Sequence, residues 1–170
     1  MKPAELARLT VEKYIKERQT LIHQTSLIGI DVQKAGTFVS IKTKDGDLRG
    51  CIGTIFPTKQ TIVEEIIHNA IAAATEDPRF DEIQRHELNN LKYSVDILYP
   101  PEPVKSFEEL NTKTYGIIVV AKNGRQALLL PDLEGIDTVE AQVSICKNKA
   151  GIPLSEPVAI QRFKVERYPE

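Results

Sequence analysis

Apolar residues recur at three- and four-residue spacing near the N-terminus, and at every second position further along the chain. Over residues 4–18, Ala7, Val11, Tyr14 and Ile15 fall on one stripe, which predicts an amphipathic helix. Pro3 suits the first turn of this helix. The apolar residues between 21 and 35 indicate either a second helical piece or a packed loop.

The period changes to two after Gly36. Residues 37–43 and 48–55 alternate in the way strands do, and the Asp45-Gly46 pair between them predicts a β-hairpin. Thr61 and Glu64 form a capping box that opens a helix running to Thr75. Residues 92–99 alternate again and stop at a cluster of prolines, which do not continue a central strand.

The second half repeats this order. Residues 115–121 and 126–130 predict a hairpin. Asp137 and Glu140 predict a capping box for a helix to about Lys149, which Gly151 closes as a left-handed cap. Residues 158–168 predict a final strand. Each half therefore contains strand, turn, strand, helix and strand, which predicts an α+β single domain of two lobes, 1–105 and 106–170, with antiparallel sheets flanked by helices.

Composition narrows the class of protein and its partners. The 170 residues carry a formal net charge of −2 and no Trp, so neither charge nor stacking side chains favour nucleic acid as a partner. No apolar run approaches the ~20 residues that span a bilayer, so we expect no membrane association. The two cysteines are far apart in sequence and no apolar leader precedes the first helix, which predicts reduced thiols and a cytoplasmic location.

The segment from Leu48 to Thr54, L-R-G-C-I-G-T, is the candidate functional centre. In a regular strand Arg49, Cys51 and Gly53 lie on one face, so Gly53 is expected to leave open space beside the thiol. A guanidinium near a thiol lowers its pKa and raises the thiolate fraction. The glycines Gly50 and Gly53 cost stability in a strand and mark a close approach of ligand or backbone. Two interpretations stay open: a reactive or binding edge, or a glycine-bent strand with a buried cysteine.

Other residues offer less chemistry. The three histidines are scattered, and His68 lies one turn from Glu64 on a helix, a spacing typical of an exposed ion pair. No zinc-ligand spacing and no phosphate-binding glycine loop occurs, so we predict no metal and no cofactor. In the Asp77-Pro78-Arg79-Phe80 segment, Pro78 disfavours helical geometry at Asp77. That segment is either a helix-ending turn or an Asp–Arg pair that holds a loop at the mouth of a cleft.

Taken together, several segments resemble the AMMECR-type domain family, in particular its AmmeMemoRadiSam system protein A branch. The resemblance covers essentially the whole chain, and its segments are L-R-G-C-I-G-T at 48–54, Asn69-Ala70 with the D-P-R-F string at 77–80, 129–132, 149–152 and Arg162-Phe163. It implies a compact two-lobed α+β domain with a cleft between the lobes. It also implies a Memo-like protein and a radical S-adenosylmethionine enzyme as partners.

The resemblance assigns candidate site residues without assigning a reaction. The motif residues taken as binding residues are Arg49, Gly50, Gly53, Asn69, Asp77, Arg79 and Phe80, and Cys51 is the candidate catalytic residue. Two functions follow: an accessory component that binds a partner or substrate through the Leu48–Thr54 strand, or an enzyme that uses Cys51 as nucleophile or redox thiol. A nucleic-acid-binding module is a third possibility. Whether the chain is an enzyme stays open at this point.

Overall fold

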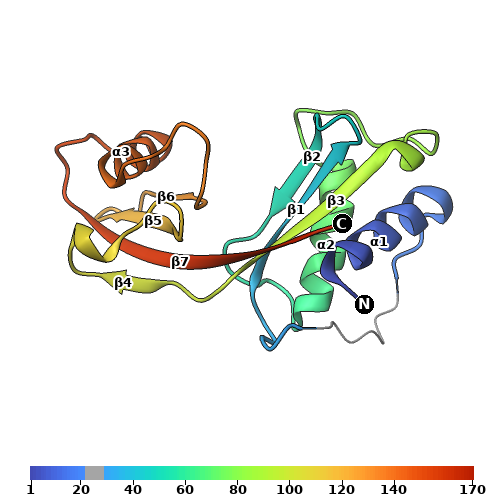
Figure 1. The fold of residues 1–170 in the computed structure, drawn as a ribbon, viewed down its shortest axis with the longest axis horizontal. Helices are drawn as coiled ribbons and strands as arrows, with labels where there is room; N and C mark the ends of the chain where they lie inside the picture. The colour runs from blue at the N-terminus through green and yellow to red at the C-terminus, as the bar shows by residue number, and fades with distance from the viewer. Residues whose placement is uncertain (22–28) are drawn as a thin grey trace. The chain divides into compact units, whose positions relative to one another are not determined.

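The computed structural model describes residues 1–21 and 29–170, which form two compact units (Figure 1). Unit 1 comprises residues 1–97 and 166–170, and unit 2 comprises residues 98–165. The element expected between 21 and 35 falls largely on residues 22–28, outside the described part. Residues 29–35 form neither helix nor strand.

Unit 1 is built from two helices and a sheet. Its elements are α1 (Pro3–Glu17), β1 (Gly36–Thr43), β2 (Leu48–Gly53), α2 (Ile62–Thr75) and β3 (Leu91–Leu98). The strands are hydrogen-bonded in the order β2–β1–β3, so β2 is the outermost of them. Helix α2 packs on β1 and β2, and α1 packs on α2. The core between these layers includes Val11, Val39, Ile41, Ile66 and Val95, each 0% exposed.

Residues close together in the sequence determine the β1–β2 hairpin and the start of α2. β1 and β2 pair antiparallel, with Ser40 opposite Cys51 and Ile41 opposite Gly50. Gly46, in the turn, has a φ of +102°, a conformation that favours glycine. The capping box of α2 is confirmed: the Glu64 N–H donates to Thr61 Oγ1 at 3.2 Å, and the Thr61 N–H donates to Glu64 Oε2 at 3.1 Å.

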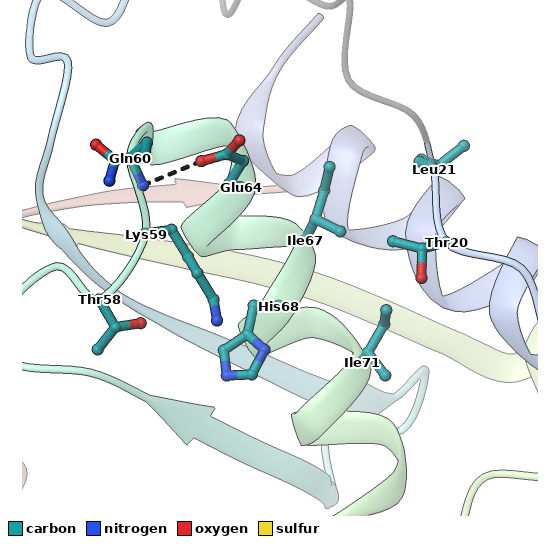
Figure 2. A pocket seen from close by; sticks show the side chains of 9 residues that line it. All are labelled: Thr20, Leu21, Thr58, Lys59, Gln60, Glu64, Ile67, His68 and Ile71. Carbon is teal, nitrogen blue, oxygen red and sulfur yellow. Dashed lines mark hydrogen bonds between the residues drawn. The ribbon is translucent and has the colours of Figure 1, made fainter.

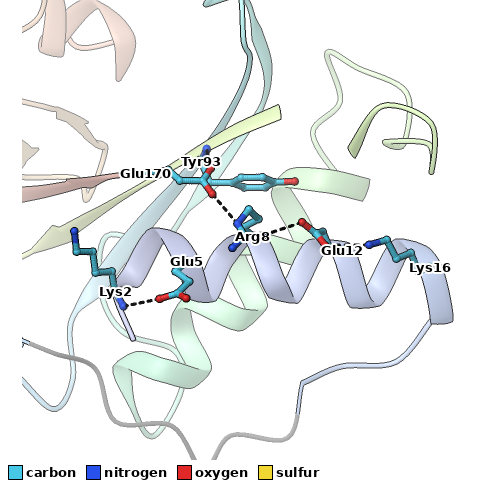
Figure 3. A network of polar contacts seen from close by, with 7 residues as sticks. All are labelled: Lys2, Glu5, Arg8, Glu12, Lys16, Tyr93 and Glu170. Atoms are coloured by element: carbon cyan, nitrogen blue, oxygen red, sulfur yellow. Dashed lines mark hydrogen bonds and ion pairs between the residues drawn. The ribbon is translucent and has the colours of Figure 1, made fainter. Parts of the chain in front are cut away.

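The C-terminal residues 166–170 return to unit 1. The backbone N–H of Glu170 donates to the carbonyl of Tyr93 at 3.0 Å. The carboxylate of Glu170 lies 2.6 Å from Nε of Arg8 on α1, and Arg8 also donates to Glu12 at 3.1 Å (Figure 3). The end of the chain is therefore tied to both β3 and α1.

Unit 2 is a second hairpin, helix and strand. Its elements are β4 (Glu102–Val104), β5 (Tyr115–Ala121), β6 (Gln126–Leu129), α3 (Val139–Lys149) and β7 (Val158–Pro169), of which β7 ends in unit 1. β5 pairs antiparallel with β6 and with β7, and β4 pairs with β7. The core includes Ile117, Val119 and Cys146, each 0% exposed. The predicted α+β class, with a hairpin, helix and strand in each half, is confirmed.

The prolines stop the strand before them, as predicted, since β3 ends at Leu98. Pro103 lies in a separate short strand, β4, which the sequence did not predict. A proline is possible there because β4 lies outside the main strand order and pairs only with β7 among the described strands. The cap of α3 is Thr138 rather than Asp137: Thr138 Oγ1 accepts the Ala141 N–H at 3.2 Å. The Asp137 carboxylate instead lies 3.5 Å from Lys113 Nζ. Gly151 has the predicted left-handed φ, +65°.

Candidate functional site

Strand β2 presents Arg49 and Cys51 on the face that points away from α2. The opposite face lies directly against the helix, because a Cβ added at Gly50 would meet the carbonyl oxygen of Ala73 at 2.1 Å. Gly50 therefore permits the close approach of α2 to the sheet. This is a packing role, and it explains one of the two glycines of the segment.

The second glycine also serves packing. A Cβ added at Gly53 would lie 2.3 Å from the ring of Phe38 and 2.5 Å from the carbonyl oxygen of Thr37. Phe38 stands opposite Gly53 in the register of the hairpin. The expectation that Gly53 leaves open space beside the thiol is wrong, because the Phe38 ring from the neighbouring strand occupies that space.

The carboxylate of Asp77 joins the D-P-R-F turn to the outer edge of β2. Asp77 Oδ2 accepts the backbone N–H of Cys51 at 2.8 Å. The same carboxylate accepts three bonds from Arg79, from its backbone N–H at 3.1 Å, from Nε at 2.9 Å and from Nη2 at 2.7 Å. The Arg79 guanidinium holds the pKa of Asp77 well below its usual range. Burial raises this pKa, but the hydrogen bonds from the backbone N–H groups of Cys51 and Arg79 lower it further.

Arg49 is held by an acidic residue that the sequence analysis did not identify. Its Nε and Nη2 donate to the two carboxylate oxygens of Glu87 at 2.7 and 2.9 Å, and Nη1 donates to the carbonyl of Asp81 at 2.9 Å. The bond from Arg49 lowers the pKa of Glu87. The Arg49 side chain is only 16% exposed, so this cation positions the connection after α2 rather than standing free beside the thiol.

Cys51 is a half-buried free thiol. Its Sγ lies 3.2 Å from Oγ of Ser40, its neighbour across the hairpin. Cys146 is also free but fully buried, and it donates to the carbonyl of Ala127 at 3.3 Å. Of the two cysteines, Cys51 is therefore the more exposed residue.

Two guanidinium groups lie near the ring of Phe80. The Cζ atoms of Arg79 and Arg49 are 5.5 and 6.0 Å from the centroid of its ring, within the range of a cation–π contact. The Arg79 side chain is 56% exposed, and Phe80 is half-buried. We call Arg49, Cys51, Asp77, Arg79 and Phe80 the β2 patch; Arg79, Phe80 and Cys51 are its solvent-accessible members.

Asn69 lies outside the patch, in a buried polar cluster behind it. Its amide nitrogen donates to the carbonyl and hydroxyl of Thr37 and to the hydroxyl of Thr54 at 2.9–3.1 Å. Thr54 in turn donates to Glu65 at 2.6 Å. Glu65, which is 0% exposed, also accepts the backbone N–H groups of Thr58 and Lys59 at 2.7 Å.

The Glu65 carboxylate stays ionised inside this cluster. Burial alone raises its pKa, but the hydrogen bonds from Thr54, Lys59 and Thr58 outweigh burial and lower it. Asn69 and Glu65 thus fix the segment that follows β2 onto α2. The sequence analysis did not identify Glu65, Glu87 or Ser40, because their hydrogen-bond partners lie on other elements. The one signal available was the position of Glu65, a charged residue inside an apolar helix.

A cavity elsewhere in unit 1 contains none of the predicted site residues (Figure 2). It has a volume of about 470 Å³ and lies along the side of α2 that carries Ile67, His68 and Ile71. Its wall extends to Leu21, the last described residue before position 29. His68 is exposed there, one turn from Glu64.

Within residues 1–21 and 29–170, no three His, Cys, Asp or Glu side chains are grouped in a way that could hold a metal ion. No helix in the same part of the chain is long and apolar enough to cross a membrane.

Comparisons with known proteins match nearly the whole chain. A family model described as AMMECR1 matches residues 4–168. A protein of Thermotoga maritima is 56% identical over 137 residues, which is 80% of this chain and 78% of its own length. Protein CA_C1420 of Clostridium acetobutylicum is 45% identical over 169 residues, 98% of this chain but only 35% of its own length. The crystal structure of the uncharacterized protein PH0010 from Pyrococcus horikoshii aligns with a TM-score of 0.84 at 29% identity, covering 99% of this chain and 89% of that one.

Proposed function

The chain belongs to the AMMECR1 family, as its sequence segments predicted, and from this premise we propose that it is an accessory component that binds a partner protein through the β2 patch. The observation that carries the proposal is the hydrogen bond from Cys51 N–H to Asp77 Oδ2 at 2.8 Å. It joins the two most distinctive segments of the sequence into one surface, although 26 positions separate them.

The patch is suited to recognition. The side chains of Asp77 and Arg49 bind other residues of unit 1, so they position the turn that contains Arg79 and Phe80. Arg79 remains 56% exposed above a half-buried Phe80, and arginine and aromatic residues are enriched at protein interfaces. Sγ of Cys51 has the hydroxyl of Ser40 as its hydrogen-bond partner. Among the described residues, no hydrogen bond joins Sγ to a histidine or a carboxylate that could act as a base.

Two partner classes follow from the branch that the sequence resembles. These are a Memo-like protein and a radical S-adenosylmethionine enzyme of the same cell, acting with this chain in the AmmeMemoRadiSam system. The Clostridium acetobutylicum relative supports an assembly of this kind, because the region it shares with this chain is 35% of a longer polypeptide. The two free cysteines support a cytoplasmic location.

Protection of Cys51 from alkylation tests the proposal. The purified chain is treated with iodoacetamide alone and with an excess of the purified Memo-like protein or radical enzyme, and labelling of Cys51 is followed by peptide mass spectrometry. A partner that covers the patch slows labelling, and bovine serum albumin serves as the control. If neither candidate partner changes the rate, the assignment of the patch to these partners fails.

The alternative function is an enzyme that uses Cys51 as nucleophile or redox thiol. It is favoured by one observation, the contact of Sγ of the half-buried Cys51 with Ser40 Oγ at 3.2 Å, since a neighbouring hydroxyl can orient a reacting sulfur. Turnover of a small substrate by the purified chain, lost in Cys51→Ser, is the result that would establish it.

A further inference from the structure

A second concave surface of unit 1 lies close to Cys51 and is lined by several lysines. It is a cavity of about 340 Å³ bounded by the outward-facing side chains of β1 and β3, by the β1–β2 turn and by the C-terminal residues of unit 1. Ser40, the hydrogen-bond partner of Cys51, is part of its wall. Its volume is in the range of cavities that bind small molecules.

Three lysines in this wall have no acidic partner. Lys42 comes from β1, Lys44 from the turn and Lys92 from β3. Among the described residues, no carboxylate forms an ion pair with any of the three, although such pairs occur elsewhere in the same part of the chain, for example between Lys13 and Glu17 and between Lys16 and Glu12. The three ammonium groups are therefore available to a ligand.

The other charges of the cavity are already matched. Arg167 donates to both carboxylate oxygens of Asp96 at 2.7 and 2.8 Å. The Glu170 carboxylate lies 2.6 Å from Nε of Arg8 (Figure 3). Since these two pairs are neutral overall, the lysines leave the residues that line the cavity with a net positive charge.

An anion would reduce the repulsion between these lysines. Lys42 and Lys92 belong to neighbouring strands and line the same cavity, and like charges on one face of adjacent strands repel each other. The hydroxyls of Ser40, Thr43 and Ser94 stand in the same wall and can donate to oxygen atoms. Ammonium groups combined with hydroxyl donors are the chemistry that recognises phosphate.

We propose that this cavity binds a small phosphorylated molecule whose phosphate is held by Lys42, Lys44 and Lys92. The proposal is independent of the partner assigned to the β2 patch. A small molecule fits better than a nucleic acid, because the exposed Asp45 and Asp47 flank Lys44 in the turn and the chain has a net charge of −2, both of which repel a long polyanion.

Titration with inorganic pyrophosphate, followed by ¹H–¹⁵N correlation spectra at low ionic strength, tests the site. We expect saturable shifts at residues 40–46 and 92–94. In the double variant K42A/K92A the dissociation constant rises roughly tenfold or more, because two charge-assisted contacts are lost. The matched control K105A/K122A removes two exposed lysines of unit 2 and leaves binding unchanged.

Three results would overturn the inference. They are shifts that do not saturate, equal weakening in the two double variants, or tighter binding of a single-stranded RNA than of pyrophosphate at the same salt concentration. Because the lysines are exposed, both variants are expected to fold, which their thermal midpoints check. If the native chain does not bind pyrophosphate but a partner still protects Cys51 from alkylation, the phosphate site is refuted and the function proposed for the β2 patch is not.

Discussion

The carboxylate of Asp77, 4% exposed, accepts the backbone N–H of Cys51 at 2.8 Å. A turn that follows α2 is thereby attached to the outer edge of β2. Unpaired N–H groups on an outer strand invite pairing with other chains, and here a side chain from the same unit satisfies one of them. The β2 patch depends on this bond and on the pair that Asp77 makes with Arg79.

Replacing Asp77 tests that bond. We expect Asp77→Asn to lower the free energy of unfolding by about 1–3 kcal/mol at pH 7, since it removes a charged acceptor from a buried site. Urea denaturation measures the change. Asp81→Asn, an exposed carboxylate in the same connection, is the control and is expected to change stability by less than ~0.5 kcal/mol.

The same residue makes stability depend on pH. The pKa of Asp77 is depressed in the folded chain, below the ~3.9 of an unfolded aspartate. Its ionised form therefore stabilises the fold at every pH above ~4, and this contribution is lost as the pH falls from ~4 through the folded pKa. The stability difference between the native chain and Asp77→Asn should shrink below pH ~4. A difference that grows with acid would contradict the linkage.

Gly50→Ala tests the packing role of the first glycine. The new Cβ would meet the carbonyl oxygen of Ala73 at 2.1 Å, and neither backbone can move without displacing α2. We expect a loss of about 1–3 kcal/mol or more, the usual cost of overpacking. Leu48→Ala, at an exposed position of the same strand, is the control. A Gly50→Ala protein as stable as that control would show that α2 does not approach the strand this closely.

The pair of Arg8 and Glu170 has a smaller predicted effect. Their side chains are 35% and 32% exposed, so a double-mutant cycle with Arg8→Ala and Glu170→Ala should give a coupling of about 0.2–1 kcal/mol. The coupling should fall as salt is raised, because the pair is partly solvated. A coupling insensitive to salt would mean that the contact in Figure 3 is not electrostatic in origin.

Much of the fold was predictable because its signals are local. The Asp45-Gly46 turn, the Thr61–Glu64 capping box and the strand at 115–121 depend on residues within a few positions of one another. The cap of α3 was misplaced by one residue because Asp137 and Thr138 are both good caps, and the choice is made by whichever side chain reaches the Ala141 N–H.

The site was predictable only in part. Alternation placed Arg49 and Cys51 on one face, but it could not reveal that Glu87 holds Arg49 from 38 positions away or that Phe38 fills the space beside Gly53. Such contacts are made by the tertiary fold, and no short-range pattern encodes them. The glycines were correctly identified as points of close approach; what approaches them is the protein itself.

Reactivity distinguishes the two cysteines and the two candidate functions. Iodoacetamide should label Cys51 in the folded chain and spare Cys146, which is 0% exposed and whose pKa is raised by burial. Labelling of both should occur in the unfolded chain. The enzyme alternative requires Cys51 to react faster when folded than when unfolded at the same pH. An equal or slower folded rate removes that alternative.

The affinity of the chain for a purified Memo-like protein or radical S-adenosylmethionine enzyme, measured by isothermal titration calorimetry, tests the central claim most directly. The account predicts that Arg79→Ala weakens binding roughly tenfold or more, as at interface hot spots. Cys51→Ser and the control Arg85→Ala, an exposed arginine of the same connection outside the patch, should leave it within about twofold. Equal affinity of Arg79→Ala and the native chain for both partners, or no binding by the native chain, would contradict the assignment of the β2 patch as the binding surface.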